Sequence, residues 1–128
     1  SKGLQLYLPL NTAATHEGTS TFALAVAQVL EKQHPDRILS QMTKAMRTGK
    51  VFIDWSQNSR HKTTIGAYSL RARPRPTVST PVAWDEVDAA AGGAPLSFTA
   101  PEVLERVEEH GDLFAAPATL EQDLPALG

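Results

Sequence analysis

The sequence predicts an α+β or mixed α/β fold, and three local patterns support this prediction. Residues 51–55 form a mostly apolar run of high β propensity, which is typical of a strand. Residues 22–30 carry apolar side chains at helical spacing, and residues 99–102 form a capping box for a helix. A chain of 128 residues, 41% of them hydrophobic, suits a single domain with a modest core.

The N-terminal part is predicted to contain a strand and a helix. Leucines alternate with other residues over positions 4–8, which predicts a strand with one apolar face that ends at Pro9. Thr19 or Ser20 is predicted to cap a helix that ends at Pro35. The apolar positions of this helix are Phe22, Val26, Val29 and Leu30.

The central part is predicted to contain the best strand of the chain, residues 51–55. A short helix is predicted before it, around residues 43–47. After it, residues 62–65 and 68–71 form either a hairpin or an ordered loop. Residues 73–82 are predicted to run as an extended connection, because three prolines exclude regular pairing in a central strand: Pro74, Pro76 and Pro81.

The C-terminal part is predicted to be helical and then flexible. A short acidic helix is expected to begin between residues 81 and 87. The capping box that starts at Thr99 predicts a helix to about His110, and Gly111 is suited to end it. Residues 115–128 contain two prolines and a terminal glycine, and are predicted to form a tail.

Composition argues against several classes of protein. The chain has no cysteine, so it has neither disulfides nor thiolate metal sites, and its four histidines lack ligand spacing. It contains no apolar run of the roughly 18 residues that a membrane span needs, and its first residues lack the organisation of a secretory signal. We therefore expect a cytoplasmic protein with no membrane partner.

Charge is distributed unevenly along the chain. Residues 37–75, called the basic segment below, hold nine basic residues and a single acid, so their local charge is +8. Residues 76–128 hold ten acids and one base, Arg106. A segment of this charge can bind the phosphates of a nucleic acid, because each neutralised phosphate releases counterions. The alternative is a solvated face that is balanced by the acidic half.

Asp54 is the focal candidate, because it is the only acid of the basic segment and lies at the end of an apolar strand. A carboxylate in such a position needs a cation or a metal ion if it is buried. Two interpretations follow from the residues. Asp54 is either a functional ligand or a member of an ion pair with Arg47, Arg71 or Lys50.

Three segments carry a family resemblance: residues 42–58, which include Phe-Ile-Asp-Trp-Ser-Gln-Asn, residues 62–65 and residues 68–78. They closely resemble the polymerase domain of bacterial non-homologous end-joining ligase D, a polymerase of the archaeo-eukaryotic primase type. The resemblance covers residues 1–114. It implies the C-terminal half of that domain, a partial primase-type fold with a mixed sheet flanked by helices, followed by a flexible tail at 115–128.

The resemblance implies a catalytic, metal-binding role for Asp54. In the family, three aspartates hold two divalent metal ions, manganese or magnesium, for nucleotidyl transfer, and Asp54 matches the third. The other two come from an Asp-x-Asp motif, which occurs nowhere in this sequence. One carboxylate does not hold a pair of ions about 3.5–4 Å apart, so we expect the chain to be inactive alone and to bind metal weakly or not at all.

The resemblance also implies nucleotide and DNA contacts. A second family motif, Ser-Gly-x-Lys-Gly-x-His, grips the triphosphate; Lys2 matches its lysine, and Gln5 stands where histidine is expected. Glutamine donates hydrogen bonds but carries no charge. The remaining implied nucleotide-binding residues are Gln57, Lys62 and Arg71, and Arg47 is expected to lie near the template or primer. The alternative for each cation is a surface charge facing the acidic half, and for Gln5 a polar residue on an exposed strand face.

The implied function is part of a DNA repair polymerase that transfers nucleotides, directed by a template, at double-strand break ends. The alternatives are a non-catalytic DNA- or nucleotide-binding remnant and a structural piece that pairs with itself. The implied partners are DNA ends, nucleoside triphosphates, the N-terminal half of the domain, a ligase domain and a Ku-type end-binding protein. Self-association is also expected, through strands that lack a neighbour.

Overall fold

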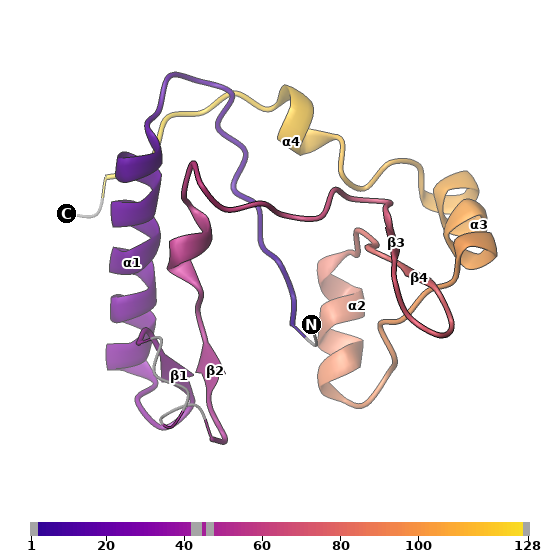
Figure 1. Ribbon diagram of the computed structural model, residues 1–128, viewed down its shortest axis with the longest axis horizontal. Helices are drawn as coiled ribbons and strands as arrows, with labels where there is room; N and C mark the ends of the chain where they lie inside the picture. Colours follow the sequence, from indigo (N-terminus) through magenta and orange to yellow (C-terminus); the bar gives the residue numbers. More distant parts are fainter. Residues whose placement is uncertain (1–2, 42–44, 46–47, 127–128) are drawn as a thin grey trace. The chain divides into compact units, whose positions relative to one another are not determined.

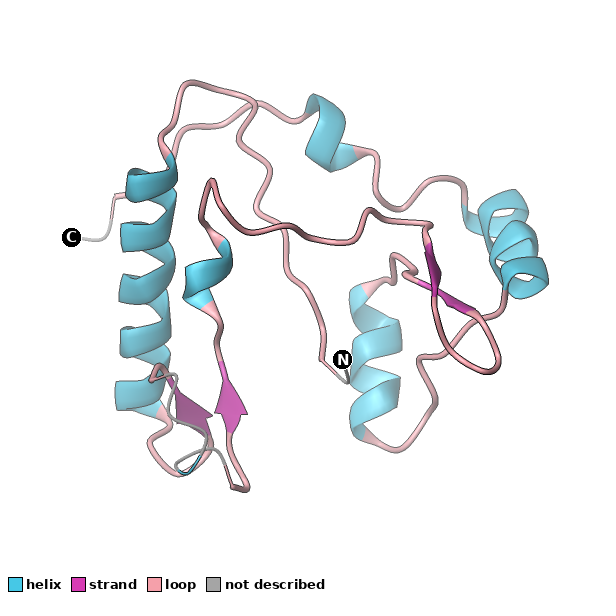
Figure 2. Ribbon diagram, in the orientation of Figure 1, coloured by secondary structure: helices cyan, strands magenta, loops and turns pink. Residues whose placement is uncertain are grey.

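The computed structural model describes residues 3–41, 45 and 48–126, and these fall into two compact units (Figure 1). The α1 unit combines the stretches Thr12–Thr64 and Glu121–Gly128. The α3 unit combines the stretches Ser1–Asn11 and Ile65–Leu120. Helices and short strands occur in the described residues of the chain (Figure 2), so the predicted α+β class is confirmed.

Helix α1, His16–Gln33, is the longest element of the α1 unit. The Thr15 side chain caps it by accepting a hydrogen bond of 2.9 Å from the backbone N–H of Gly18. The predicted start at Thr19 or Ser20 is therefore wrong by about one turn, because Thr15 supplies an earlier cap. The end agrees with the sequence, since His34 is the C-cap and precedes Pro35.

Strands β1, Ile38–Leu39, and β2, Val51–Phe52, pair in parallel, with Ile38 opposite Val51. Helix α1 packs on β1 and on the 3-10 helix η2, Trp55–Gln57. The buried side chains of this unit include Ala27 and Leu39. The predicted strand 51–55 is thus shorter than expected, because the chain turns into η2 after Asp54. The helix predicted around residues 43–47 lies mostly outside the described residues.

A polar network fixes the turn after β1. Glu31 on α1 accepts hydrogen bonds from the backbone N–H and the hydroxyl of Ser40, at 2.7 and 3.0 Å. The indole Nε1 of Trp55 donates to the carbonyl oxygen of Ser40 at 3.0 Å. The end of β1 is therefore tied both to α1 and to η2, the helix that follows Asp54.

In the α3 unit, strands β3, Leu70–Arg71, and β4, Thr77–Val78, form an antiparallel hairpin. The prolines of residues 73–82 are predicted to exclude regular pairing in a central strand, and β4 is an edge strand, so the pairing of β4 does not conflict with that prediction. Both strands belong to a two-stranded sheet, in which proline is tolerated because every strand is an edge. Pro74 and Pro76 precede β4 in the hairpin loop and remove no hydrogen bond from the ladder.

The described residues of the α3 unit also form the helices α2, Trp84–Ala91, α3, Ala100–His110, and α4, Ala116–Thr119. Glu102 accepts from the backbone N–H and the hydroxyl of Thr99, at 3.0 and 2.8 Å, as the capping motif predicts. Gly111 ends α3 with φ 72°, a conformation that favours glycine. The predicted helix from Thr99 to His110 is confirmed, and so is a short acidic helix near residue 84.

Arg106 joins α3 to α2. Its guanidinium donates to both carboxylate oxygens of Glu86, at 2.5 and 2.8 Å, and to the carbonyl oxygen of Pro81 at 3.1 Å. The same guanidinium lies over the ring of Phe98, 4.4 Å from its centroid. Val103, one turn earlier on α3, is buried. The side of α3 that carries these residues faces the rest of its unit.

Residues 4–8 lie outside any strand, so the strand predicted there is wrong. Alternation predicts which side chains share a face, but a strand also needs a neighbour, and in the described residues this stretch is in no ladder. Leu4 and Leu6 are 61% and 76% exposed. Tyr7, in contrast, packs edge-on against Phe114, with ring centroids 4.9 Å apart.

The segment after residue 114 has secondary structure where the sequence predicts a tail. Helix α4 lies there, and the Asn11 side-chain amide donates to the carbonyl oxygens of Pro117 and Leu120, at 3.0 and 2.8 Å. In the α1 unit, the Thr12 hydroxyl donates to the carbonyl oxygen of Gln122 at 2.8 Å. Across the described residues, no helix has both the length and the apolar character that a bilayer crossing requires.

Candidate functional site

Asp54 lies at the junction of β2 and η2, where it is exposed to solvent. The strand supplies Val51 and Phe52, and the chain then turns sharply into Trp55–Gln57. Asp54 is the N-cap of this short helix, since its side chain accepts from the backbone N–H of Ser56. The sequence forms this turn because an aspartate caps a following backbone N–H with little strain.

Three donors surround the carboxylate of Asp54. Its Oδ1 accepts from the backbone N–H of Ser56 at 3.2 Å and from the Ser56 hydroxyl at 2.6 Å. Its Oδ2 accepts from the side-chain amide of Gln57 at 3.3 Å. The Nζ of Lys62 donates in turn to the hydroxyl oxygen of Ser56 at 2.6 Å. Asp54, Ser56, Gln57 and Lys62 are called the Asp54 cluster below.

The cluster favours the ionised carboxylate. Partial burial raises the pKa of Asp54, but the hydrogen bonds from Ser56 and Gln57 and the positive charge of Lys62 lower it, and the net result is a lowered pKa. Asp54 is therefore an anion at neutral pH, which is the state that binds a cation.

The ion pairs considered for Asp54 are not seen within the described part of the α1 unit. Lys50 makes no ion pair with Asp54 there, and hydrogen bonds from neutral groups take that place. Arg47 lies outside the described residues, and Arg71 belongs to the α3 unit. The carboxylate thus has no need of a paired cation to offset burial, because it is exposed.

The residues described here fit one ligand of a divalent metal ion but not a full set. A carboxylate is the oxygen donor that magnesium and manganese prefer, and Asp54 presents it at the surface. Among the described residues, however, no group of three or more His, Cys, Asp or Glu side chains could hold a metal ion. Any metal site that includes Asp54 needs further ligands from elsewhere.

The structure brings together three of the residues singled out from the sequence: Asp54, Gln57 and Lys62. Gln5 is exposed and Arg71 is half-buried in β3, both in the α3 unit. The remaining two, Lys2 and Arg47, lie outside the described residues. The roles assigned to all of these residues stay predictions.

Sequence reasoning missed Ser56, which contributes two of the three hydrogen bonds to Asp54. A signal for it exists in the sequence. Aspartate followed two residues later by serine is typical of a turn in which the aspartate accepts from the serine backbone. The signal is weak, because it predicts the backbone contact and not the contact of the hydroxyl.

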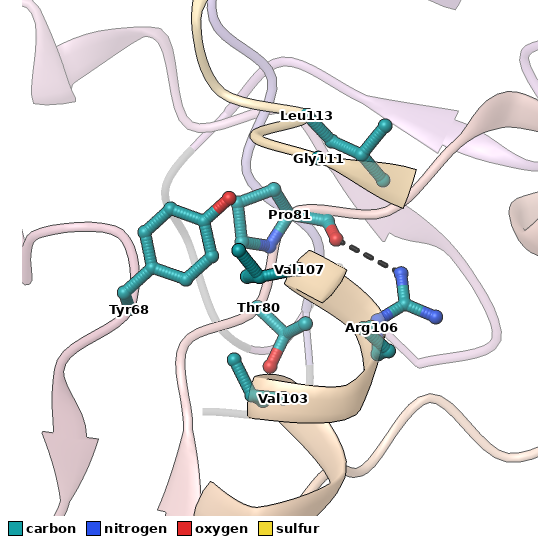
Figure 3. Close-up of a pocket in the computed structure, with 8 residues that line it drawn as sticks. All are labelled: Tyr68, Thr80, Pro81, Val103, Arg106, Val107, Gly111 and Leu113. Atoms are coloured by element: carbon teal, nitrogen blue, oxygen red, sulfur yellow. Dashed lines mark hydrogen bonds between the residues drawn. The ribbon is translucent and has the colours of Figure 1, made fainter. Parts of the chain in front are cut away.

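Hollows away from the Asp54 cluster differ in size within the described residues. A pocket of about 10 Å³ in the α3 unit lies between Tyr68, Pro81 and Val107 (Figure 3), and has room for about one water molecule. A wider groove of about 410 Å³ lies between α1 and β1 and includes Lys32 and Lys50. The first is too small for a nucleotide, and neither is lined by a residue of the Asp54 cluster.

Comparison with protein families gives one match over most of the chain. The model described as LigD, primase-polymerase domain, matches residues 1–114. The multifunctional non-homologous end joining protein LigD of Mycolicibacterium smegmatis is 49% identical over 125 residues, which are 98% of this chain and 16% of that protein. The LigD of Mycobacterium tuberculosis H37Rv is 50% identical over 113 residues, 88% of this chain and 14% of that protein.

A solved structure is similar in fold as well as in sequence. The polymerase domain from Mycobacterium tuberculosis ligase D, in complex with DNA, superposes with a TM-score of 0.76 and 47% identity. The match covers 82% of this chain and 36% of that chain. This chain therefore spans about a third of that solved domain, and the resemblance and the partial primase-type fold expected from the sequence are confirmed.

Proposed function

Because this chain belongs to the family of LigD primase-polymerase domains, we propose that it is part of a polymerase that adds nucleotides at broken DNA ends. A role of its relatives in non-homologous end joining is stated in their names. We assign a role in the same process to this chain, as part of an enzyme that carries out template-dependent nucleotidyl transfer. We further propose that the chain is inactive alone.

One observation carries the proposal. The family match covers residues 1–114, and within it the single acid of the basic segment stands exposed at the end of β2, with its carboxylate ionised and oriented by three donors. An exposed, ionised and oriented carboxylate is what a cation ligand requires. The sequence contains no Asp-x-Asp motif, which supports inactivity of the chain by itself.

The roles of the other residues follow from the same proposal. Asp54 would be one ligand of the metal site, and two divalent ions, manganese or magnesium, would stabilise the attacking and leaving oxygens in the complete domain. Gln57, Lys62 and Arg71 would contact the triphosphate, since amide and cationic donors suit phosphate oxygens. Lys2 and Gln5 would join them, and Arg47 would contact DNA.

The proposed organisation is a C-terminal half of the polymerase domain over residues 1–114, with residues 115–128 outside it. The N-terminal half of such a domain would be the first partner of this chain, and DNA ends and nucleoside triphosphates its ligands. A ligase domain and a Ku-type protein are the further partners that the proposal includes.

A non-catalytic remnant that binds DNA or nucleotide is the second candidate. The observation that favours it is Gln5, which stands where the family motif has histidine. Glutamine donates a hydrogen bond to phosphate but carries no charge and exchanges no proton. Such a protein would still bind DNA or nucleotide through the basic segment but would not catalyse nucleotidyl transfer.

A gap-filling assay with manganese and ribo- or deoxyribonucleotides tests the proposal. The chain alone is expected to leave a primer unextended. Fused to the remaining part of the Mycolicibacterium smegmatis polymerase domain, it is expected to extend the primer, and the same fusion with Asp54→Asn is expected not to. A fusion that folds and binds DNA without extending the primer supports the second candidate. Extension by the purified chain alone would contradict the proposal.

A further inference from the structure

The hydrogen bonds of the Asp54 cluster have a fixed direction. A lysine ammonium only donates, so the contact of 2.6 Å between Lys62 Nζ and Ser56 Oγ makes the serine hydroxyl an acceptor there. A serine hydroxyl has one hydrogen. That hydrogen must therefore serve the second contact of 2.6 Å, to Asp54 Oδ1. The donors run from Lys62 through Ser56 to Asp54.

Ser56 is the residue on which the orientation of Asp54 depends most. It supplies two donors, its backbone N–H and its hydroxyl, and both go to the same carboxylate oxygen. The third donor, the amide of Gln57, is longer at 3.3 Å and comes from an exposed side chain. Rotation of the Asp54 side chain would break both contacts with Ser56, whereas Ser56 itself is half-buried in η2.

Lys62 is engaged by this contact. The family resemblance assigns Lys62 to the triphosphate, but its Nζ here binds a protein hydroxyl six residues back along the chain. An exposed lysine gains little from a lone surface contact. The contact of Lys62, however, fixes the direction of the Ser56 hydroxyl. It therefore also affects the orientation of the Asp54 carboxylate, which accepts from that hydroxyl.

We propose that Ser56 is a positioning residue: Lys62 holds its hydroxyl, and the hydroxyl holds the Asp54 carboxylate in one orientation for a divalent cation. This inference rests on the proposed function, because it takes Asp54 as a cation ligand. Carboxylate ligands are in general themselves hydrogen-bonded, and loss of such a supporting contact typically costs about 10–100-fold in metal affinity.

The first measurement reads the orientation of Asp54 without any metal. The three-bond couplings between Hα and the two Hβ atoms of Asp54 report its χ1 rotamer. One rotamer is expected in the unaltered chain and in Ser56→Thr, which keeps the hydroxyl. Averaging over rotamers is expected in Ser56→Ala and, to a smaller extent, in Lys62→Met, which removes the ammonium group.

Matched controls lie in the same loop. Ser59→Ala removes another serine hydroxyl, one that accepts from the backbone N–H of His61 and does not touch Asp54. Arg60→Ala removes an exposed positive charge two residues before Lys62. Both variants are expected to leave Asp54 in one rotamer, which separates the proposed contact from general effects of charge or loop stability.

The second measurement uses manganese ion as the probe. Paramagnetic broadening of the amide signals of residues 53–57 gives an apparent affinity even for weak binding. Ser56→Ala is expected to weaken it by about tenfold, and Ser56→Thr to restore it. Asp54→Asn is expected to abolish the broadening, which tests the ligand role separately from the positioning role.

The outcomes separate the two proposals. If Asp54→Asn leaves the broadening unchanged, Asp54 is not a cation ligand and the proposed function loses its central residue. If Asp54→Asn abolishes the broadening but Ser56→Ala retains both the single rotamer and the affinity, the positioning role of Ser56 is overturned. Should Ser56→Ala fail to fold, Lys62→Met decides: unchanged couplings and affinity in that exposed variant overturn the inference as well.

Discussion

At the scale of single residues, the chemistry of this chain centres on an aspartate that serves two purposes. Asp54 caps η2 through the backbone of Ser56, and its carboxylate remains exposed and ionised. The cap explains why an acid is tolerated at the end of an apolar strand without a paired cation. Because Asp54 caps η2, its backbone position is stabilised even when no ligand is bound.

The two purposes of Asp54 can be separated by substitution. Asparagine keeps a side-chain oxygen for the cap, whereas alanine keeps none. We expect Asp54→Asn to change the free energy of unfolding by less than about 0.5 kcal/mol and Asp54→Ala to lower it by about 1 kcal/mol. Urea denaturation of the three proteins without metal measures both. A loss of several kcal/mol for Asp54→Asn would identify a buried ion pair instead.

Local signals explain which parts of the site were predictable. Asp54 stood out because it is the single acid of the basic segment, and its place at a strand end could be read from the residues before it. Ser56 could not be ranked in the same way, because its importance depends on where its hydroxyl points. That direction is determined by Lys62, six residues away, and by the fold of the loop between them.

At the scale of elements, the join between α2 and α3 is the strongest electrostatic feature of the described residues. The side chains of Arg106 and Glu86 are only 15% and 27% exposed, and they meet through two hydrogen bonds. The hydrogen bonds from Arg106 lower the pKa of Glu86 to about 2, although partial burial opposes them. The ordinary value for glutamate is 4.5.

This lowered pKa makes the stability of the chain depend on pH. The folded pKa of Glu86 is depressed, so its contribution is fully present above about pH 4.5 and is lost as pH falls towards about 2. We expect the loss to be about 1–3 kcal/mol, since the pair is only partly exposed. Urea denaturation at several pH values between about 2 and 6 measures it.

Two variants isolate the contribution of this pair. In Glu86→Gln the acid-dependent component should disappear, and stability at neutral pH should fall because Arg106 loses its charged partner. Glu105→Gln removes an exposed acid from α3, the helix that carries Arg106, and should leave the component in place. Equal acid sensitivity of the Glu86→Gln variant and the unaltered chain would show that other carboxylates carry the effect.

The predictability of the elements follows the range of the contacts that form them. The start and end of α3 were predicted because each depends on local contacts: Thr99 with Glu102 at the start, and Gly111 with Val107 at the end. The parallel partner of β2 was not predicted, since pairing with Ile38 depends on the chain between the two strands. The strand expected over residues 4–8 was wrong for the same reason: its alternation is local, but a ladder is not.

At the scale of the whole molecule, uneven charge and exposed apolar residues determine how the chain meets other molecules. The basic segment has a local charge of +8, and residues 76–128 are acidic. The described residues also expose several large apolar side chains, among them Leu4, Leu6, Trp84 and Leu104. The first property suits a polyanion, and the second suits a protein surface.

The charge distribution predicts binding to DNA ends or single strands that is weak, sensitive to salt and independent of sequence. If about three to five phosphates of duplex DNA are contacted, a plot of the logarithm of the affinity against the logarithm of the salt concentration should have a slope of about −3 to −5. Fluorescence anisotropy with labelled DNA measures this slope.

Variants test which residues bind the phosphates. Arg47→Ala and Arg71→Ala should weaken binding by similar factors on all sequences, whereas Lys32→Ala, outside the basic segment, should not. Binding that ignores salt would refute the electrostatic account.

The exposed leucines predict self-association of the chain. Leu4 and Leu6 lie in a stretch that is in no ladder within the described residues, so their side chains are available to a second copy. We expect a dimer or a larger oligomer in light scattering across a concentration series, and a shift towards monomer in Leu6→Lys. Ser20→Lys, which adds the same charge on α1, should not produce that shift. A monomer at every concentration, with residues 4–8 protected from hydrogen exchange, would contradict this prediction.

The hydrogen bonds of Asn11 and Thr12 have a consequence for how the chain acquires its structure during synthesis. Asn11 contacts residues 106 and 109 positions later in sequence, and Thr12 contacts one 110 positions later. Each unit is therefore assembled from two stretches that leave the ribosome far apart in time. The contacts of Asn11 and Thr12 cannot form until residues 117–122 have left the ribosome, and synthesis proceeds at about 5–20 residues per second. Contacts of such long separation close slowly, so residues 117–122 are expected to join their units later than the local helices and turns form.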